Sequence, residues 1–254
     1  MRFTNAIVRS PCEKMTEGLS SADLGKPDYT LALKQHHEYV LALEACGLKV
    51  RVLPPDDNYP DSTFVEDTAL LTEGLAIITH PGAASRKGEV HSMSIVIHEF
   101  FDTVAYILDP GTLEAGDVMM VGKHFFVGLS ERTNIEGAQQ LNSILESHGM
   151  KLTVVEIKDM LHLKSGVSYL ENNMLLAVEQ FESLPAFGHL DILPVPAQEA
   201  YAANSVWIND TVLVPDGYPV TMQNIMSAGY EVIVLDMSEF RKLDGGLSCL
   251  SLRF

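Results

Sequence analysis

A cysteine close to the C-terminal end of the sequence is a candidate nucleophile. Cys249 stands in the segment DGGLSCLSLRF, where Gly245 and Gly246 would let the backbone approach a ligand closely. Cysteine attacks an electrophile as the thiolate, so it needs a lowered pKa or a proton acceptor beside it. A cysteine can equally be a small buried apolar side chain. The segment alone leaves both interpretations open.

A histidine in the segment DMLHLKSGVSYL is a candidate general acid and base. The imidazole of His162 ordinarily titrates near neutral pH, which suits it to giving and taking protons in catalysis. Its neighbours Leu161 and Leu163 also fit a histidine that is simply hydrogen-bonded at the edge of a strand. A catalytic role for His162 is favoured only if the cysteine lies close to it.

Two groups of carboxylates directly precede predicted strands. Asp61, Glu66 and Asp67 lie in PDSTFVEDTALL, and Glu114 and Asp117 lie in GTLEAGDVMMVG. Apolar neighbours make these acids awkward to solvate, and a buried charge needs a partner. A cationic ligand would supply one. Because the chain has 34 acidic residues, ordinary surface acids are the simple alternative.

Two arginines occupy matching places after predicted hairpins and before predicted helices. They are Arg86 in PGAASRKGE and Arg132 in SERTNIEG. Basic residues oppose the preference of a helix first turn for acids, and two guanidinium groups can bind one carboxylate. The alternative is a pair of exposed surface arginines. Acids for a cation, arginines for a carboxylate, a thiol and a histidine together outline a hydrolase of a guanidino amino acid.

These residues would be positioned by one plan that the chain repeats five times: a hairpin, a helix and then a strand. An opening strand over Thr4–Arg9 belongs to a unit whose hairpin partner comes from elsewhere in the chain. Apolar arms around short polar turns predict the other four hairpins. These hairpins are Asp67–Ile78, Asp117–Val127, Tyr169–Val178 and Ser205–Val214.

Helices follow the hairpins, and they begin near residues 27, 86, 134, 183 and 219. The first starts at Pro27 and ends before Gly47, while Thr133 and Glu136 form a capping box for the third. A strand follows each helix: Lys49–Leu53, Val104–Leu108, Leu152–Ile157, Asp191–Val195 and Glu231–Leu235. A repeat of tens of residues without polar end caps predicts a closed ring, a single α/β domain over residues 1–254.

Composition excludes several classes of protein. A net charge of −17 argues against nucleic-acid partners and anionic membranes, and it is compatible with cationic substrates. The sequence has neither a run of the roughly 18–20 apolar residues that span a membrane nor the apolar core of a signal peptide. Cys12, Cys46 and Cys249 suggest no disulfide framework and no thiolate zinc site, so we expect a cytoplasmic protein. No phosphate, dinucleotide or metal motif is present, so we predict no cofactor and no metal.

Several segments together resemble the dimethylarginine dimethylaminohydrolases, in the form of the short bacterial members. The resemblance runs from about residue 5 to residue 254. It implies the fold of the guanidine-modifying enzymes, the five-bladed α/β propeller or pentein. The segments are GLSSADLGKPDY, YPDSTFVEDTALL, GTLEAGDVMMVG, SERTNIEGA, LHLKSGVSYLENNMLLA, YAANSVWIND and RKLDGGLSCLSLRF.

The resemblance implies hydrolysis of Nω-methylated L-arginine to L-citrulline and methylamine or dimethylamine, through a covalent thiouronium on cysteine and without a cofactor. The nucleophile would be Cys249 and the general acid and base His162, with Glu114 orienting the histidine and contacting the guanidinium. Asp67 would bind the guanidinium. A mobile lid would cover Glu17–Asp28, with Gly18 and Gly25 as hinges. The other substrate-contacting positions would be Leu19, Asp61, Glu66, Arg86, Arg132 and Leu243.

Two alternative functions stay open at this stage. An arginine deiminase uses similar chemistry on unmethylated arginine, but those proteins resemble longer chains with a helical insertion that is absent here. A non-catalytic module that binds arginine analogues is the other alternative, and the complete set of Cys249, His162 and Glu114 argues against it. The degree of methylation of the substrate, a homodimer and metal binding to the thiol are left open by the sequence.

Overall fold

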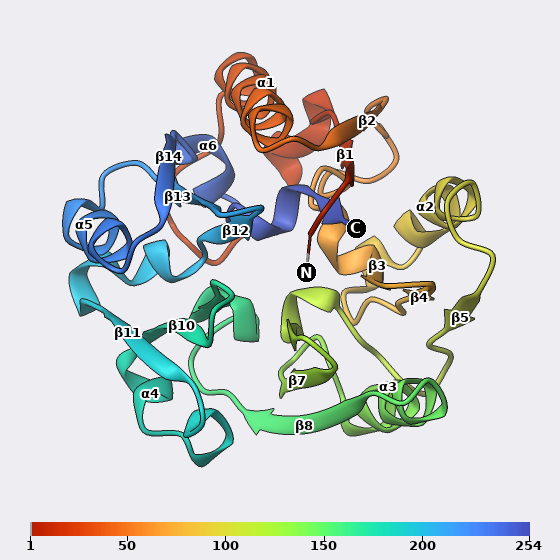
Figure 1. The fold of residues 1–254 in the computed structure, drawn as a ribbon. Helices are drawn as coiled ribbons and strands as arrows, with labels where there is room; N and C mark the ends of the chain where they lie inside the picture. The colour runs from red at the N-terminus through yellow and green to blue at the C-terminus, as the bar shows by residue number, and fades with distance from the viewer. Residues whose placement is uncertain (1) are drawn as a thin grey trace.

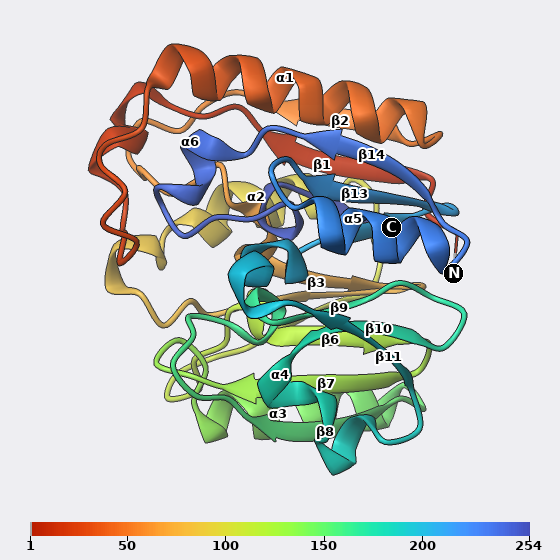
Figure 2. The same ribbon diagram turned by 90° about the vertical axis from the view of Figure 1, so that its left-hand side faces the viewer.

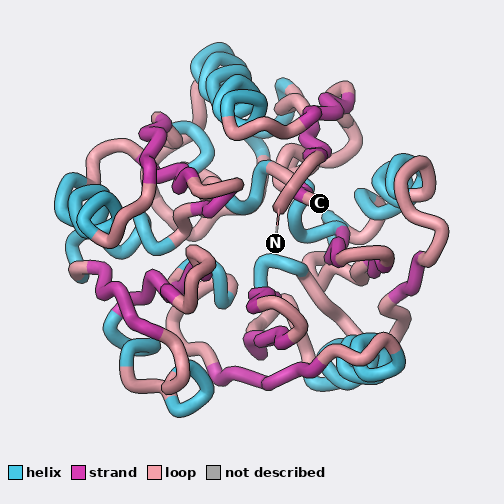
Figure 3. Tube along the Cα trace, viewed as in Figure 1, coloured by secondary structure: helices cyan, strands magenta, loops and turns pink. Residues whose placement is uncertain are grey.

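A computed structural model describes residues 2–254 as five three-stranded sheets, arranged as blades around a central axis (Figure 1). In each blade the middle strand pairs antiparallel with the inner strand and parallel with the outer one. The longer helices lie outside the ring of strands, and short helical segments lie close to the axis (Figure 3). The closed ring of five units predicted from the repeats, and the five-bladed α/β propeller implied by the family resemblance, are therefore confirmed.

The first blade is built from both ends of the chain. Strand β1 (Asn5–Arg9) pairs parallel with β2 (Lys49–Leu53) and antiparallel with β15 (Leu252–Arg253). Its helix is α1 (Tyr29–Ala45). The prediction that the hairpin partner of the opening strand comes from elsewhere is confirmed, and the partner is the C-terminal strand.

The other four blades follow one another along the chain, each with its helix between the middle and outer strands. Blade two has β3 (Ala69–Thr72), β4 (Leu75–Ile78), α2 (Glu89–Ile97) and β5 (Val104–Tyr106). Blade three has β6 (Val118–Val121), β7 (His124–Leu129), α3 (Ile135–Ser147) and β8 (Lys151–Glu156). Blade four has β9 (Val167–Tyr169), β10 (Met174–Val178), α4 (Glu179–Glu182) and β11 (Asp191–Val195). Blade five has β12 (Val206–Ile208), β13 (Thr211–Pro215), α5 (Pro219–Ser227) and β14 (Glu231–Leu235), and α6 (Ser238–Arg241) follows it.

The helix starts correct two details of the sequence prediction. The capping box at Thr133 and Glu136 is wrong: Asn134 caps α3 by accepting from the Gly137 N–H at 2.8 Å. Thr133 instead accepts from the Glu114 N–H at 3.1 Å through its hydroxyl oxygen. In the fourth blade the predicted helical turn is present as a short 3₁₀ helix (η6, Pro185–Phe187), but a short α-helix that was not predicted begins before it, at Glu179.

Burial follows the blade pattern. Middle strands such as β4, β7 and β13 are almost wholly buried, while in outer strands such as β2 and β14 all but the last side chain are exposed or half-buried. The apolar clusters lie between neighbouring sheets and beneath the helices, for example around Tyr39, Phe240 and Leu250. In the part of the chain that the structure describes, no helix has the length and apolar character needed to cross a membrane.

A short 3₁₀ helix precedes the inner strand of each blade. These helices are η2 (Val65–Thr68), η4 (Ala115–Asp117), η5 (Leu163–Ser165), η7 (Ala197–Ala203) and η8 (Ser248–Leu250). Because the inner strands run alongside the axis, their starts meet at one end of the ring. Figure 2 shows the strands from the side, with the chain termini toward one end and the segment before α1 toward the other. The candidate residues lie at the end of the ring where the inner strands start.

Candidate active site

The five 3₁₀ helices bring together residues that are far apart in the sequence. Glu66 and Asp67 lie in η2, while Glu114 and His162 directly precede η4 and η5. Cys249 lies in η8. The fifth position, directly after η7, holds Asn204. One end of the ring therefore collects a side chain from every blade.

Two adjoining cavities meet at Cys249 and His162. The first lobe is about 710 Å³, and the second lobe is about 530 Å³. The first lobe is lined by the expected residues Leu19, Asp61, Asp67, Arg86, Arg132 and Leu243, and the second by Glu66 together with Gly116, Lys164, Tyr201, Asn204 and Ser248. Glu114 lies behind His162 and is fully buried. The residues singled out in the sequence thus surround one divided pocket.

His162 is held by carboxylates. Its Nε2 lies 2.9 Å from Glu114 Oε2. Burial alone would lower the pKa of His162, but the charge of Asp67 and the hydrogen bond to Glu114 outweigh it and raise that pKa to about 9. A Cβ at Gly116 would lie 2.7 Å from Nδ1 of the imidazole, so only glycine fits there without displacing the ring. At neutral pH the side chain is an imidazolium.

Cys249 is half-buried and carries a thiol, not a thiolate, at neutral pH. Burial, and then the charges of Glu66 and Asp67, raise the pKa of Cys249 to about 12. The Gly246 N–H points at Sγ from 3.4 Å, which favours the thiolate only weakly. The lowered pKa that the sequence argument asked for is therefore absent in the ligand-free pocket.

Asp67 and Glu66 are both saturated with partners from the chain. Asp67 Oδ2 accepts from Arg86 at 2.6 Å and Oδ1 from the Gly116 N–H at 2.9 Å. Burial raises the pKa of Asp67, but His162 and Arg86 outweigh it and lower that pKa to about 2. Glu66 accepts from Lys164 Nζ and from Ser248 Oγ, each at 2.6 Å. Asp67 is therefore ionised at neutral pH, and Glu66 accepts two hydrogen bonds at the wall of the pocket.

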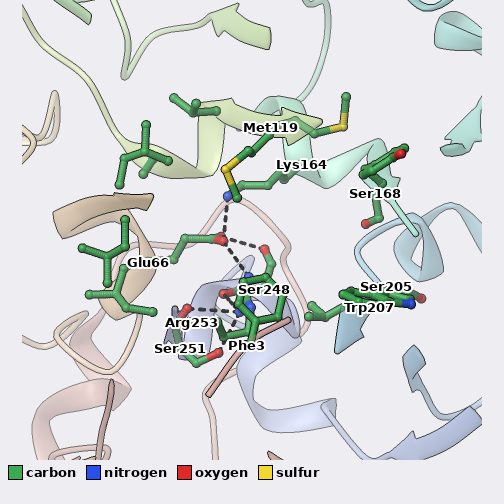
Figure 4. A pocket seen from close by; sticks show the side chains of 18 of the residues that line it. Phe3, Glu66, Met119, Lys164, Ser168, Ser205, Trp207, Ser248, Ser251 and Arg253 are labelled. Carbon is green, nitrogen blue, oxygen red and sulfur yellow. Dashed lines mark hydrogen bonds and ion pairs between the residues drawn. The ribbon is translucent and has the colours of Figure 1, made fainter. Parts of the chain in front are cut away.

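Glu66, Lys164 and Ser248 also line a third cavity, on the far side of the pocket (Figure 4). This central cavity, about 140 Å³, runs along the axis and is lined by Trp207, Ser168 and Arg253 among others. Figure 4 shows Lys164, Ser248 and Arg253 converging on the Glu66 carboxylate. Their ion pairs and hydrogen bond form the partition between the central cavity and the second lobe.

The segment before α1 covers the first lobe. Leu19 N–H donates to Asp61 Oδ1 at 3.0 Å, and Ser21 N–H donates to Asp244 Oδ2 at 2.5 Å. Burial raises the pKa of Asp61. Asp244 directly follows Leu243, so the covering segment is tied to the same stretch of chain that leads to Cys249.

The two arginines that looked equivalent in the sequence differ in the structure. Arg86 is buried, and its guanidinium is bound by Asp67, by Glu89 and by the carbonyl of Phe64. Arg132 lines the first lobe with one long contact, 3.4 Å from Nη1 to Glu114 Oε1. Arg132 is therefore the arginine whose donors face a ligand.

Metal-binding donors do come together in the described chain. Oxygen or nitrogen atoms of Asp67, Glu114 and His162 lie within 4.8 Å of one another. Each of these groups already has a partner, since His162 binds Glu114 and Asp67 binds Arg86. The cluster works here as an ion-pair network around the imidazole.

Sequence reasoning missed four residues of the site. Gly116, Lys164 and Ser248 stand beside predicted residues, and Asn204 lies in the segment YAANSVWIND that carried the family resemblance. The partners of Glu66 are 98 and 182 residues away in the chain, so no spacing could reveal them. Only proximity to the chosen motifs could have drawn attention to them.

Comparison with known proteins places this chain in a family. Residues 25–183 match a family described as N,N dimethylarginine dimethylhydrolase, eukaryotic. The N(G),N(G)-dimethylarginine dimethylaminohydrolase of Pseudomonas aeruginosa is 50% identical over 253 residues, which is 99% of this chain and 100% of that protein.

Solved structures agree with the sequence match. The C249S mutant of the Pseudomonas aeruginosa protein in complex with citrulline superposes with a TM-score of 0.99 at 49% identity, covering 100% of both chains. A dimethylarginine dimethylaminohydrolase H162G adduct with S-methyl-L-thiocitrulline superposes with a TM-score of 0.98 at 50% identity, covering 99% of this chain and 100% of that one. By sequence over its full length and by fold, the chain belongs to the dimethylarginine dimethylaminohydrolase family.

Proposed function

We propose that the protein hydrolyses Nω-methylated L-arginine to L-citrulline and methylamine or dimethylamine, with Cys249 as nucleophile and His162 as general acid and base. The observation that carries this proposal is the junction of the two lobes. There a thiol and an imidazolium stand beside the carboxylates of Asp67 and Glu66, in a pocket whose other end offers Asp61 and Arg132.

The substrate would bind with its amino acid end in the first lobe. Asp61 would contact the α-ammonium together with the backbone at Leu19 and Leu243, and Arg132 would bind the α-carboxylate. Asp67, Glu66 and Glu114 would hold the guanidinium near Cys249. Arg86 would act by holding Asp67 in place, because its own donors are occupied.

The substrate's own charge would activate the nucleophile. Glu66 and Asp67 raise the pKa of Cys249, and a guanidinium placed between these carboxylates and the thiol reverses the local potential. The thiol then loses its proton to water as the cation docks. The thiolate attacks the central guanidinium carbon, forming a C–S bond.

His162 would serve as acid first and as base second. As an imidazolium it donates its proton to the departing amine while the C–N bond breaks, leaving a thiouronium on Cys249. The neutral imidazole then takes a proton from the attacking water. Collapse of that adduct breaks the C–S bond and releases the hydroxyl proton to water, which gives L-citrulline and restores the thiolate.

The test is to incubate the protein with L-arginine and with its mono- and dimethylated forms and to measure citrulline. We expect citrulline from the methylated forms and none from the Cys249→Ser variant, because a serine hydroxyl stays un-ionised at neutral pH. The control is Cys46→Ala, which removes a buried thiol in the α1 cluster away from the pocket. Citrulline from unmethylated arginine alone would contradict the proposed substrate and favour a deiminase.

The proposal further treats residues 1–254 as a single catalytic domain that acts in the cytoplasm, where the three cysteines stay reduced. We propose a homodimer as its quaternary state, and the alternative is a monomer. Light scattering of the purified protein decides between the two, since the masses differ by a factor of two.

A further inference from the structure

One of the five equivalent positions at the site has no assigned role. The 3₁₀ helices of the other blades supply Glu66, Glu114, His162 and Cys249, and the fifth blade supplies Asn204 at the end of η7. Asn204 is buried, with 7% of its surface exposed, and it lines the second lobe.

The side-chain amide of Asn204 joins the two segments that carry the proposed acid and nucleophile. Its Nδ2 donates to the Lys164 carbonyl at 2.9 Å and to Ser248 Oγ at 3.0 Å. Its Oδ1 accepts from the Ser248 N–H at 2.9 Å. Lys164 follows His162 by two residues, and Ser248 directly precedes Cys249. One amide therefore spans the gap between the imidazole segment and the thiol segment.

Two further features make this bridge stiff. A Cβ at Gly246 would lie 2.5 Å from Asn204 Cγ, so the turn before Cys249 packs directly on the amide. Ser248 Oγ, which accepts from Asn204, donates to Glu66, and the same carboxylate binds Lys164 Nζ. The contacts close into a ring through Asn204, Ser248, Glu66 and Lys164.

Glu66 joins the same two segments through the side chains of Lys164 and Ser248, whereas Asn204 binds the backbone of both. Among the hydrogen bonds of residues 2–254, none joins Cys249 Sγ to the imidazole of His162, so their spacing depends on what holds the two segments. We propose that Asn204 is a positioning residue that sets the distance between Cys249 and His162 through its hydrogen bonds to Ser248 and Lys164. This inference rests on the proposed function.

The variant that tests it is Asn204→Ala, with Asn204→Ser in its place if the alanine protein does not fold. A displacement of about 1 Å at the reacting groups can cost about 100-fold in rate, so we expect kcat to fall about 100-fold. KM should stay within about threefold, because Asp61 and Arg132 hold the substrate in the first lobe.

Asn209→Ala is the matched control. The Asn209 amide also makes three hydrogen bonds: Nδ2 donates to the carbonyls of Phe3 and Cys46, and Oδ1 accepts from the Phe3 N–H. It lies in the β12–β13 turn, and its φ of 49° adds backbone strain when alanine replaces it. The control should therefore lose at least as much thermal stability while keeping kcat within about twofold.

A second readout needs no substrate. Alkylation of Cys249 is followed across pH by mass spectrometry of the peptide that contains it. Loosening the segment exposes the thiol, so its alkylation midpoint should move down from about 12 toward the ordinary cysteine value in Asn204→Ala and stay in place in Asn209→Ala. If the wild type releases no citrulline, the proposed function fails, and this midpoint still tests the bridge.

Two results would overturn the inference. One is an unchanged kcat and an unchanged alkylation midpoint in Asn204→Ala together with a loss of thermal stability like that of the control, which would make Asn204 only structural. The other is a raised KM at an unchanged kcat, which would place Asn204 in substrate binding instead.

Discussion

At the scale of single residues, one group of carboxylates explains the protonation of both proposed reacting groups. Burial, and then the charges of Glu66 and Asp67, raise the pKa of Cys249, while Asp67 and Glu114 raise that of His162 against the effect of burial. The negative potential keeps a proton on each. Under the proposed function, a cationic substrate would change the potential that both groups experience.

The raised pKa of His162 also predicts how stability depends on pH. The folded value of about 9 exceeds the unfolded value of 6.5, so the imidazolium stabilises the fold fully below pH 6.5, and that contribution is lost as pH rises to 9. At about 1.4 kcal/mol per pKa unit, the loss is as much as about 3 kcal/mol.

Urea denaturation of the wild type and of His162→Gln across this pH window measures the effect. Glutamine keeps a hydrogen-bond donor for Glu114 but does not titrate, so its free energy of unfolding should fall less than that of the wild type between pH 6.5 and 9. Parallel curves for the two proteins would show that His162 does not carry the charge.

The contrast between the two arginines gives a second prediction. Arg132→Ala should lower kcat/KM for a methylated arginine at least about tenfold, because it removes the proposed partner of the substrate carboxylate. The loss should shrink for a methylated agmatine, which has no carboxylate. Equal losses for both ligands would show that Arg132 supports structure instead of binding the carboxylate.

Arg86→Ala is the comparison variant for that experiment. It strands Asp67 and Glu89 in a buried site, and breaking a buried ion pair in this way costs about 3–5 kcal/mol. We expect Arg86→Ala to lower the free energy of unfolding strongly, and Arg132→Ala to lower it little.

At the scale of elements, the sequence patterns predicted correctly the hairpin turns and strand bounds that depend on neighbouring residues alone. The hairpin turns at Gly74, Gly122 and Asn209 and the bounds of β2, β11 and β14 agree with the structure. Two-residue polar turns between apolar arms need no distant partner to form. The arrangement of the site was harder to predict from the sequence. Its segments stood out by composition, but the burial of Arg86 and the bridge through Asn204 depend on contacts between blades that no spacing reveals.

The start of α3 gives the prediction at this scale. Asn134 Oδ1 accepts from Gly137 N–H and from Thr112 N–H, both at 2.8 Å, so Asn134→Ala should cost about 1–2 kcal/mol of unfolding free energy. Glu136→Ala, at the exposed position once assigned to a capping box, should cost less than about 0.5 kcal/mol. Chemical denaturation of the two variants measures this difference, and a larger loss at Glu136 would restore the capping box.

At the scale of the whole molecule, the first blade closes the ring. Thr4 and Asn5 donate to the Phe254 carbonyl at 2.8 Å each, and the Phe254 N–H donates to the Asn5 carbonyl at 3.0 Å. Leu252 is buried against β3, and the Phe254 ring packs on Phe100 and Phe101. The ring is therefore closed by a short ladder of backbone hydrogen bonds and by the apolar packing of Leu252 and Phe254.

Deleting Leu252–Phe254 tests how much the closure contributes. Three backbone hydrogen bonds and one buried leucine are worth roughly 4–6 kcal/mol together. We expect the melting temperature to fall by about 10 °C or more, since 1 kcal/mol corresponds to about 2–4 °C in a protein of this size. Calorimetry measures the shift. A melting temperature close to that of the full chain would mean that the ring is held without β15.

The meeting of both chain ends in one sheet makes the position of the ends arbitrary within the ring. A short glycine linker from Phe254 back to the strand at Asn5, with a new opening at the exposed turn of Glu73 and Gly74, would give a circular permutant with the same order of blades in space. In that permutant the linker joins β15 to β1, so that all three strands of the first blade come from one stretch of chain. A covalent connection then replaces the pairing of the two chain ends.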